Sequence, residues 1–125
     1  WRCHPANLVS CWLTLDDVDA SNGAMHLIPG SHLQGLGESH ERSPESGALL
    51  DVGQRVDTSQ AEVVDLPAGG ALFHHCQTLH YTPPNATFRQ RRALAIHLMP
   101  PGTRSGHTGE TLDVSYARPM LRMRF

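Results

Sequence analysis

The stretch that decides the fold is Leu8-Val9-Ser10-Cys11-Trp12-Leu13-Thr14-Leu15. Its odd-numbered residues from Val9 onward are apolar or weakly polar, whereas Ser10, Trp12 and Thr14 occupy the alternate positions. Successive side chains of a β-strand point to opposite faces, so this period of two predicts a strand rather than a helix. We therefore expect a strand over residues 8–15 with Trp12 on one face, between Ser10 and Thr14.

Short segments of the same kind follow along the chain, separated by turns rich in glycine and proline. They predict further strands at residues 24–28, 61–66, 71–75, 79–82 and 91–99. Asn22-Gly23 is a strong turn signal, so we expect the strands at 8–15 and 24–28 to pair as antiparallel neighbours. Many short strands without a convincing amphipathic helix predict an all-β sandwich or barrel. The polar, Gly-, Ser- and Glu-rich region at about residues 33–60 is expected to be a long surface excursion.

Composition and charge narrow the classes of function. The chain has 125 residues, 39% hydrophobic and 18% charged, which is typical of one soluble globular domain. A net charge of −2 argues against nucleic-acid or anionic-membrane partners, and no apolar run is long enough for a membrane span. Three scattered cysteines without a CxxC pair favour a reducing compartment, and basic residues that are all arginine suggest a GC-rich genome. We expect a cytoplasmic, bacterial protein.

The candidate chemistry lies in the last third of the chain. His80 and Thr82 are two residues apart on a predicted strand, so their side chains share a face. On the strand at 91–99, the face that carries Arg91 also carries two small alanines, Ala93 and Ala95, and then His97. Such a face suits a lined cavity with a cation at its end, and Trp12 could form a third wall. A shift of one residue would instead turn Arg92 inward, and both arrangements stay open.

Two further pairs of ionisable residues, His74-His75 and Asp16-Asp17, have structural roles as an alternative to a place in the site. The adjacent residues His74 and His75 point to opposite faces, so at most one can join His80. We take His75 as that residue, either behind the site or in the core. Asp16 and Asp17 open a turn, where aspartate is favoured for bonding to the backbone, and we give them no catalytic role.

The residue types at this candidate site fit a metal and a carboxylic acid. Neutral imidazole, as in His80, binds iron, zinc, copper or nickel, and two histidines with one carboxylate form the open site of non-heme iron oxygenases. The planar guanidinium of Arg91 can donate two parallel hydrogen bonds to a carboxylate, and the hydroxyl of Thr82 can donate a third.

An ordered set of segments resembles the phytanoyl-CoA dioxygenase family of iron- and 2-oxoglutarate-dependent oxygenases. The resemblance covers most of residues 8–100, whereas 33–60 and the C-terminal tail match poorly. It rests on Val9–Asp17, Asn22-Gly23, Ile28–His32, Pro67–His74, Leu79–Asn85 and Arg91–Leu94.

The resemblance implies a cupin-like jelly roll, the double-stranded β-helix, with residues 1–125 as the C-terminal part of a single oxygenase domain. It implies that His80 is the C-terminal histidine of the metal triad. It also implies that Arg91 pairs with the distal carboxylate of 2-oxoglutarate, with Thr82 assisting and Trp12 walling the pocket. The family's first two ligands, a His-X-Asp pair, are expected just before Trp1. His4 does not replace them, because position 6 is alanine.

The implied activity is that of an Fe(II)- and 2-oxoglutarate-dependent dioxygenase that hydroxylates a small organic molecule. The enzyme would convert 2-oxoglutarate and O2 to succinate and CO2, and this stretch alone is expected to be inactive. Three alternatives stay open. They are a non-catalytic cupin-like module that binds a small acid, a halogenase, and another metal-dependent cupin enzyme working with zinc or manganese.

Overall fold

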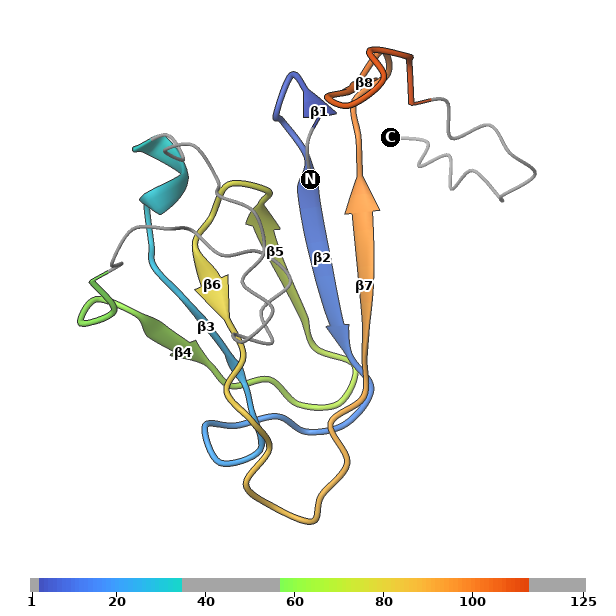
Figure 1. Ribbon diagram of the computed structural model, residues 1–125. Coiled ribbons are helices and arrows are strands. Elements are labelled where there is room, and N and C mark those ends of the chain that lie inside the picture. Colours follow the sequence, from blue (N-terminus) through green and yellow to red (C-terminus); the bar gives the residue numbers. More distant parts are fainter. Residues whose placement is uncertain (1–2, 35–56, 113–125) are drawn as a thin grey trace, which may run out of the picture.

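The computed structural model describes residues 3–34 and 57–112, which form two three-stranded antiparallel sheets (Figure 1). The first sheet has the order β5-β2-β7, made of Ala71–His75, Val9–Thr14 and Ala93–Leu98. The second has the order β4-β3-β6, made of Glu62–Val64, Met25–Leu27 and His80–Tyr81. A short 3-10 helix at Ser31–Leu33 follows β3. No helix within these ranges has the length and apolarity needed to span a membrane. The expectation of an all-β jelly roll is confirmed.

The register of the first sheet confirms the predicted faces. β2 is its central strand, and residues directly opposite one another on neighbouring strands share a face. On the β7 side, the face that carries Trp12 contains three cross-strand pairs: Ser10 with His97, Trp12 with Ala95, and Thr14 with Ala93. The alternation in the sequence therefore assigned the correct side chains of both strands to one face.

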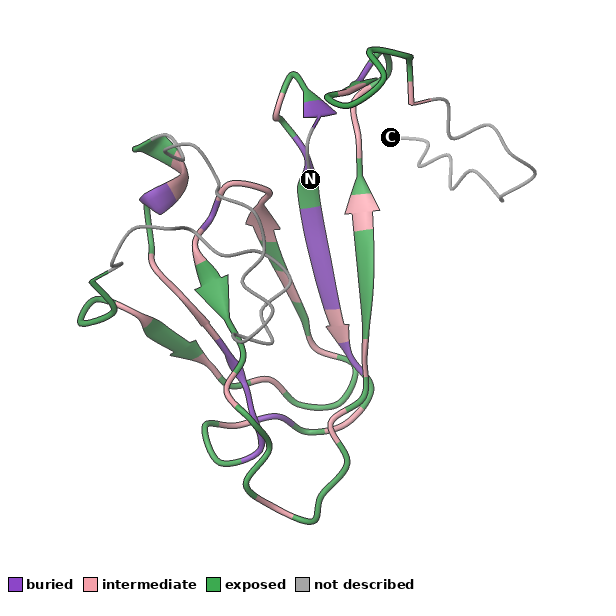
Figure 2. Ribbon diagram, viewed as in Figure 1, coloured by how far each residue is buried: buried purple, intermediate pink, exposed green. Residues whose placement is uncertain are grey.

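The core lies between the two sheets and is centred on Trp12. This side chain is only 7% exposed and packs with Val18, Ala24 and Met25. Trp12 belongs to β2 and Met25 to β3, so the cluster joins the sheets. Figure 2 shows the same arrangement, with the middle of β2 buried while much of β5 and β7 is half-buried or exposed.

The predicted hairpin between residues 8–15 and 24–28 is wrong. β2 pairs with β5 and β7, whereas β3 pairs with β4 and β6 in the other sheet. The Asn22-Gly23 turn closes within the connecting segment, where the backbone N–H groups of Asn22 and Ala24 both donate to the Asp19 carbonyl, at 3.2 and 2.9 Å. The connection therefore passes from one sheet to the other instead of returning along β2.

Two further strands escaped prediction because they are very short. β1 at Cys3–His4 pairs antiparallel with β8 at Arg104–Ser105. Two residues are too few to show an alternation, so only the long-range pairing identifies them. Of the expected excursion at 33–60, residues 35–56 lie outside the described ranges.

An ion pair fixes the start of β7 against the end of β2. The guanidinium of Arg92 donates through Nη2 to Asp16 Oδ1 at 2.7 Å and through Nε to Asp16 Oδ2 at 3.0 Å. The Arg92 backbone N–H also donates to Asp16 Oδ2, at 2.8 Å. Chiefly through the side-chain hydrogen bonds from Arg92, the pKa of Asp16 is lowered from 3.8 to about 2. Asp16 thus has a structural role, but through an ion pair with the distant Arg92 and not through the local turn bonding that was expected.

Because of the ion pair between Asp16 and Arg92, we predict that part of the unfolding free energy is lost in acid. A carboxyl group whose pKa is lower in the folded state stabilises the fold above its unfolded pKa, and that contribution is lost as pH falls through the folded pKa. We expect the unfolding free energy to fall between about pH 4 and about pH 2, and Asp16→Asn to remove part of that slope. Urea unfolding at a series of pH values measures it.

Asp65→Asn, at an exposed aspartate outside the pair, is the matched control and should leave the slope in place. An acid slope in Asp16→Asn as steep as in the wild type would contradict the assignment.

Candidate metal and cosubstrate site

The backbone of Leu79, the residue before His80, is hydrogen-bonded through both its N–H and its carbonyl group, which fixes the start of β6. The Leu79 N–H donates to Ser31 Oγ at 2.9 Å, and the Leu79 carbonyl accepts from the Ile28 N–H at 3.0 Å. Within the ring, Nδ1 lies 2.8 Å from the Thr78 carbonyl oxygen, which can only accept. In the neutral ring the hydrogen is therefore on Nδ1, and Nε2 presents its lone pair. Metal-binding histidines are commonly oriented in this way.

The histidine beside His80 is His74, not His75. The ring centroids of His74 and His80 are 4.5 Å apart, with the planes tilted by 51°. His75 points to the other face of β5, and its ring centroid lies 5.3 Å from that of His32. The expectation for His75 is corrected because β5 pairs with β2 in a register that sets His74 opposite Ser10, on the inner face.

His74 is part of a polar row that crosses the inner face of the first sheet. The row consists of His74, Ser10 and His97, which are opposite one another on β5, β2 and β7. Ser10 Oγ and His97 Nδ1 are hydrogen-bonded at 2.9 Å. Burial lowers the pKa of His74, and the neighbouring histidines lower it further, against a raising effect of its bond to the His75 carbonyl. This environment favours the neutral form of the ring.

Arg91 lies at the opposite end of this inner face, against Gly23. A Cβ atom placed on Gly23 would lie 3.2 Å from Arg91 Nε and 2.7 Å from the Pro83 carbonyl oxygen. Gly23 also has φ of +94°, a conformation that other residues rarely adopt. The glycine thus lets the guanidinium stem of Arg91 approach the backbone that follows Thr82. Arg92 is directed elsewhere, because its exposed side chain pairs with Asp16.

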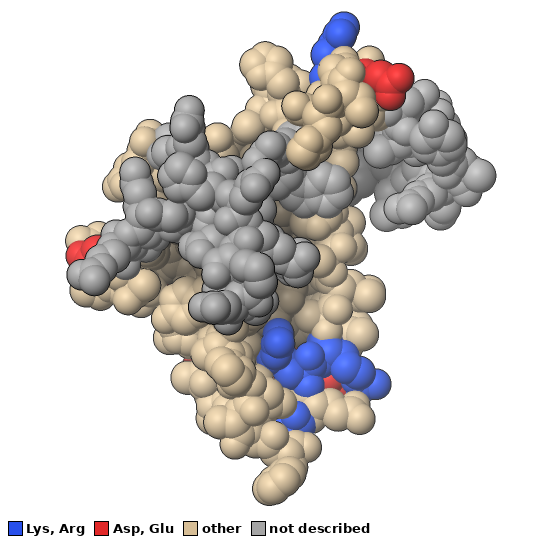
Figure 3. Space-filling view, viewed as in Figure 1, with Lys and Arg blue, Asp and Glu red and all other residues tan. Residues whose placement is uncertain are grey.

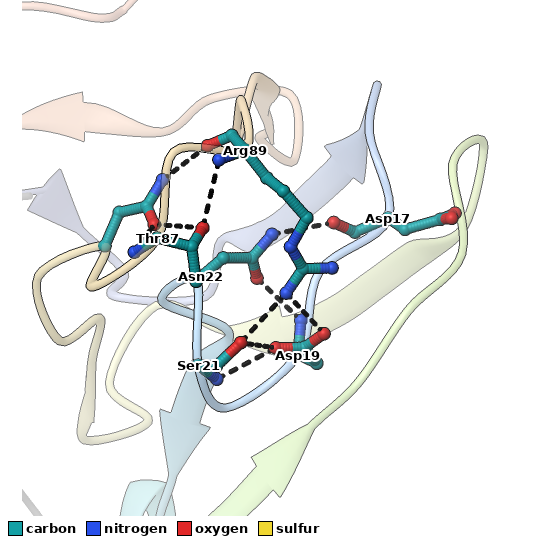
Figure 4. Close-up of polar contacts among 7 residues, drawn as sticks. Asp17, Asp19, Ser21, Asn22, Thr87 and Arg89 are labelled. Carbon is teal, nitrogen blue, oxygen red and sulfur yellow. Dashed lines mark hydrogen bonds and ion pairs between the residues drawn. The ribbon is translucent and has the colours of Figure 1, made fainter.

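A network of polar contacts supports the turn that ends at Gly23 (Figure 4). Arg89 Nη2 donates to Asp19 Oδ2 at 2.7 Å and to Ser21 Oγ at 2.9 Å. The buried amide of Asn22 accepts from the Asp19 N–H at 2.8 Å and donates to the Asp17 carbonyl at 2.9 Å. The Ser21 hydroxyl, and next the Arg89 guanidinium, hold the pKa of Asp19 well below its usual range. The segment before Arg91 is thereby tied to the turn before Gly23.

Basic side chains gather, with an acidic group among them, where β7 begins (Figure 3). Arg89 and Arg92 are neutralised there by Asp19 and Asp16. Arg91 has no carboxylate partner among the ion pairs of residues 3–34 and 57–112. Its cation is therefore the one in this group that a bound carboxylate could complement.

The structure does not bring the four candidate residues of the sequence together at a single site. They are His80, Thr82, Arg91 and Trp12. His80 adjoins the polar row near Ser10, whereas Arg91 and the Thr82–Pro83 backbone meet at Gly23. Trp12 lies between these two ends, in the hydrophobic core. Ser10 and Thr14, which mark the two ends of the inner face on β2, are about 13 Å apart at the usual rise of a strand. Within the described ranges no three His, Cys, Asp or Glu side chains converge on a metal position.

Sequence reasoning missed two residues of this arrangement. His74 could have been found from the alternation of β5, but only once its register against β2 was known. Gly23 was noticed as a turn residue, and nothing local in the sequence indicates its close approach to Arg91 and Pro83.

Comparison with known proteins places these features in a family. The family model of phytanoyl-CoA dioxygenase (PhyH) matches residues 1–93. A probable alpha-ketoglutarate-dependent hypophosphite dioxygenase of Stutzerimonas stutzeri is 31% identical over 105 residues, which are 77% of this chain and 36% of that protein. The chain thus spans about a third of the length of this relative, and 33% of a second relative, from Danio rerio.

Solved structures agree with the sequence relatives. The apo form of the non-heme monooxygenase ThoJ superimposes with a TM-score of 0.70 at 25% identity, covering 84% of this chain and 38% of ThoJ. EvdO2 of Micromonospora carbonacea var. aurantiaca, in complex with 2-oxoglutarate, superimposes with a TM-score of 0.64 at 31% identity, covering 78% of this chain and 38% of EvdO2. With the jelly-roll sheets and the match over residues 1–93, we conclude that the chain belongs to the phytanoyl-CoA dioxygenase family.

Proposed function

We propose that the complete protein is an Fe(II)- and 2-oxoglutarate-dependent dioxygenase that hydroxylates a small organic molecule. The observation that carries the proposal is the placement of two side chains at opposite ends of the inner face. His80 is oriented for a metal at one end, and Arg91, which has no carboxylate partner within residues 3–34 and 57–112, lies at the other. Membership of the family and the likeness to EvdO2 with bound 2-oxoglutarate support it.

In this proposal each of the four residues has a distinct role. His80 binds iron through Nε2, because Nδ1 is engaged by the Thr78 carbonyl. Arg91 pairs with the distal carboxylate of 2-oxoglutarate, assisted by the hydroxyl of Thr82. Trp12 forms a wall between the two ends and, through its burial, helps to exclude water.

The donor atoms present fit one position of the iron site. Two histidines and a carboxylate form the open site of non-heme Fe(II) oxygenases, so two further ligands are needed, and the family resemblance implies that they are a His-X-Asp pair. Iron and 2-oxoglutarate, when bound there, would supply the oxidising chemistry with O2, one oxygen atom going to the substrate and the other to succinate, with release of CO2. The protein orients the reactants and keeps the site dry.

The proposal as a whole is tested by product analysis of the purified complete protein. Succinate that forms only with Fe(II), 2-oxoglutarate and O2 together is the expected result. Binding of 2-oxoglutarate without succinate under these conditions would instead identify a small-acid-binding module. Activity with zinc or manganese that ignores 2-oxoglutarate would identify another metal-dependent cupin enzyme.

Arg91→Ala is expected to raise the Kd for 2-oxoglutarate while leaving metal affinity nearly intact. Removing one partner of a charge-assisted, bidentate pair costs about 2–5 kcal/mol, which corresponds to a Kd higher by roughly 30-fold or more. Anaerobic titration with 2-oxoglutarate, followed by the visible absorption of its iron complex, measures the Kd.

The matched control is Arg92→Ala, which removes a neighbouring arginine that is paired with Asp16 outside the site. We expect its Kd for 2-oxoglutarate to stay near the wild-type value. Equal losses of metal and 2-oxoglutarate binding in Arg91→Ala would refute the role given to Arg91.

His80→Ala is expected to abolish stoichiometric iron binding, because it removes a metal ligand and not only a support. Metal analysis of the reconstituted protein, after removal of loosely bound iron, provides the measurement. His107→Ala, at an exposed histidine next to β8, should bind iron as the wild type does. An unchanged iron content in His80→Ala would show that the metal, if bound, is held elsewhere.

A further inference from the structure

The contact between His74 and His80 joins two elements that are otherwise in separate sheets. His74 is on β5 of the first sheet, and His80 opens β6 of the second. Their ring centroids are 4.5 Å apart and the ring planes are tilted by 51°. This is van der Waals contact in a tilted geometry that rings prefer over a face-to-face sandwich. The position of the His80 ring therefore depends on the first sheet as well as on its own strand.

His80 needs such a support because its own strand gives it little. β6 has only two residues, His80 and Tyr81, which pair with Leu27 and His26 of β3. His80 is exposed, and the hydrogen bond from Nδ1 to Thr78 is a contact within its own chain segment. That bond orients the ring relative to its own segment only, and a packed neighbour on the other sheet further restricts the direction in which Nε2 points.

His74, in contrast, lies on a longer strand that is paired along its whole length. β5 has five residues and pairs with β2 along its whole length, with His74 opposite the buried Ser10. The His74 ring is also tied to the backbone, with Nδ1 3.1 Å from the His75 carbonyl oxygen. The imidazole on the longer, fully paired strand is thus packed against the imidazole on the two-residue strand.

We propose that His74 is a positioning residue, whose ring packs on His80 and holds the Nε2 atom of His80 toward the metal. This inference rests on the proposed function, in which His80 is a ligand. It assigns His74 no bond to the metal and no proton transfer. What matters is a flat ring of the right size at this place on β5, which makes the role separable from ligation by substitution.

Two substitutions in the complete protein separate the role of the ring from that of its nitrogens. His74→Ala removes the ring, and we expect the Kd for Mn(II) in the presence of 2-oxoglutarate to rise about 10- to 100-fold, as when a support behind a metal ligand is lost. His74→Phe keeps a flat ring but no nitrogen, and we expect it to restore a Kd close to that of the wild type. Isothermal titration calorimetry gives the affinities.

The control is His75→Ala, which removes the adjacent histidine on the opposite face, beside His32. We expect it to leave the Kd for Mn(II) unchanged, and guanidinium unfolding of the metal-free variants separates lost affinity from lost folding. A wild-type Kd in His74→Ala would overturn the proposal. So would a His74→Phe variant as weak as His74→Ala, because a nitrogen of His74 would then be required.

Failure of the proposed function has a different signature. If the wild type binds no Mn(II), or if His80→Ala binds it as tightly as the wild type, His80 is not a ligand, and the inference fails together with the proposed function. If both of those controls behave as expected and only the His74 variants do not, the proposed function stands and only the inference fails.

Discussion

The packing of Trp12 between the two sheets is the interaction on which the rest of the structure depends. Its side chain projects from the central strand of one sheet onto Met25 of the other, with Val18 and Ala24 beside it. Burial of an indole removes a large apolar surface from water, which is a main source of stability in a domain of this size. The same contact keeps the polar row of His74, Ser10 and His97 and the Arg91 corner on one inner face, at opposite ends of the core.

The two ends of that face are built by different means. At the histidine end, positions are set by ring contacts and by bonds from imidazole Nδ1 atoms to backbone carbonyls. At the arginine end, a glycine with positive φ admits the side chain of Arg91, and the Arg89–Asp19 network fixes the loop before it. Arg89 and Arg92 form ion pairs with Asp19 and Asp16, so among the described residues at this end the uncompensated positive charge lies on Arg91.

Parts of the site could be predicted from the sequence because they depend on local alternation. The shared face of His97, Ala95 and Ala93, and the matching face of Ser10, Trp12 and Thr14, follow from a period of two within each strand. That Asp16 is structural was also expected, but its ion pair with Arg92 could not be read from its place in a turn. The choice of His75 over His74 failed, because alternation says that the two differ and does not say which one faces the other sheet.

The sequence by itself determined the class of fold, the faces of the strands and the residues that could bind a metal or a carboxylate. Each of these depends on residues that are close together in the chain. Only the tertiary structure decided which strands pair. β2 and β3 are neighbours in the chain but belong to different sheets, whereas β2 and β7 lie far apart in the chain and side by side in space. Pairing depends on burying one apolar face of the whole domain at once. For that reason the contact of His74 with His80, and that of Gly23 with Arg91, exists only when the sheets have assembled.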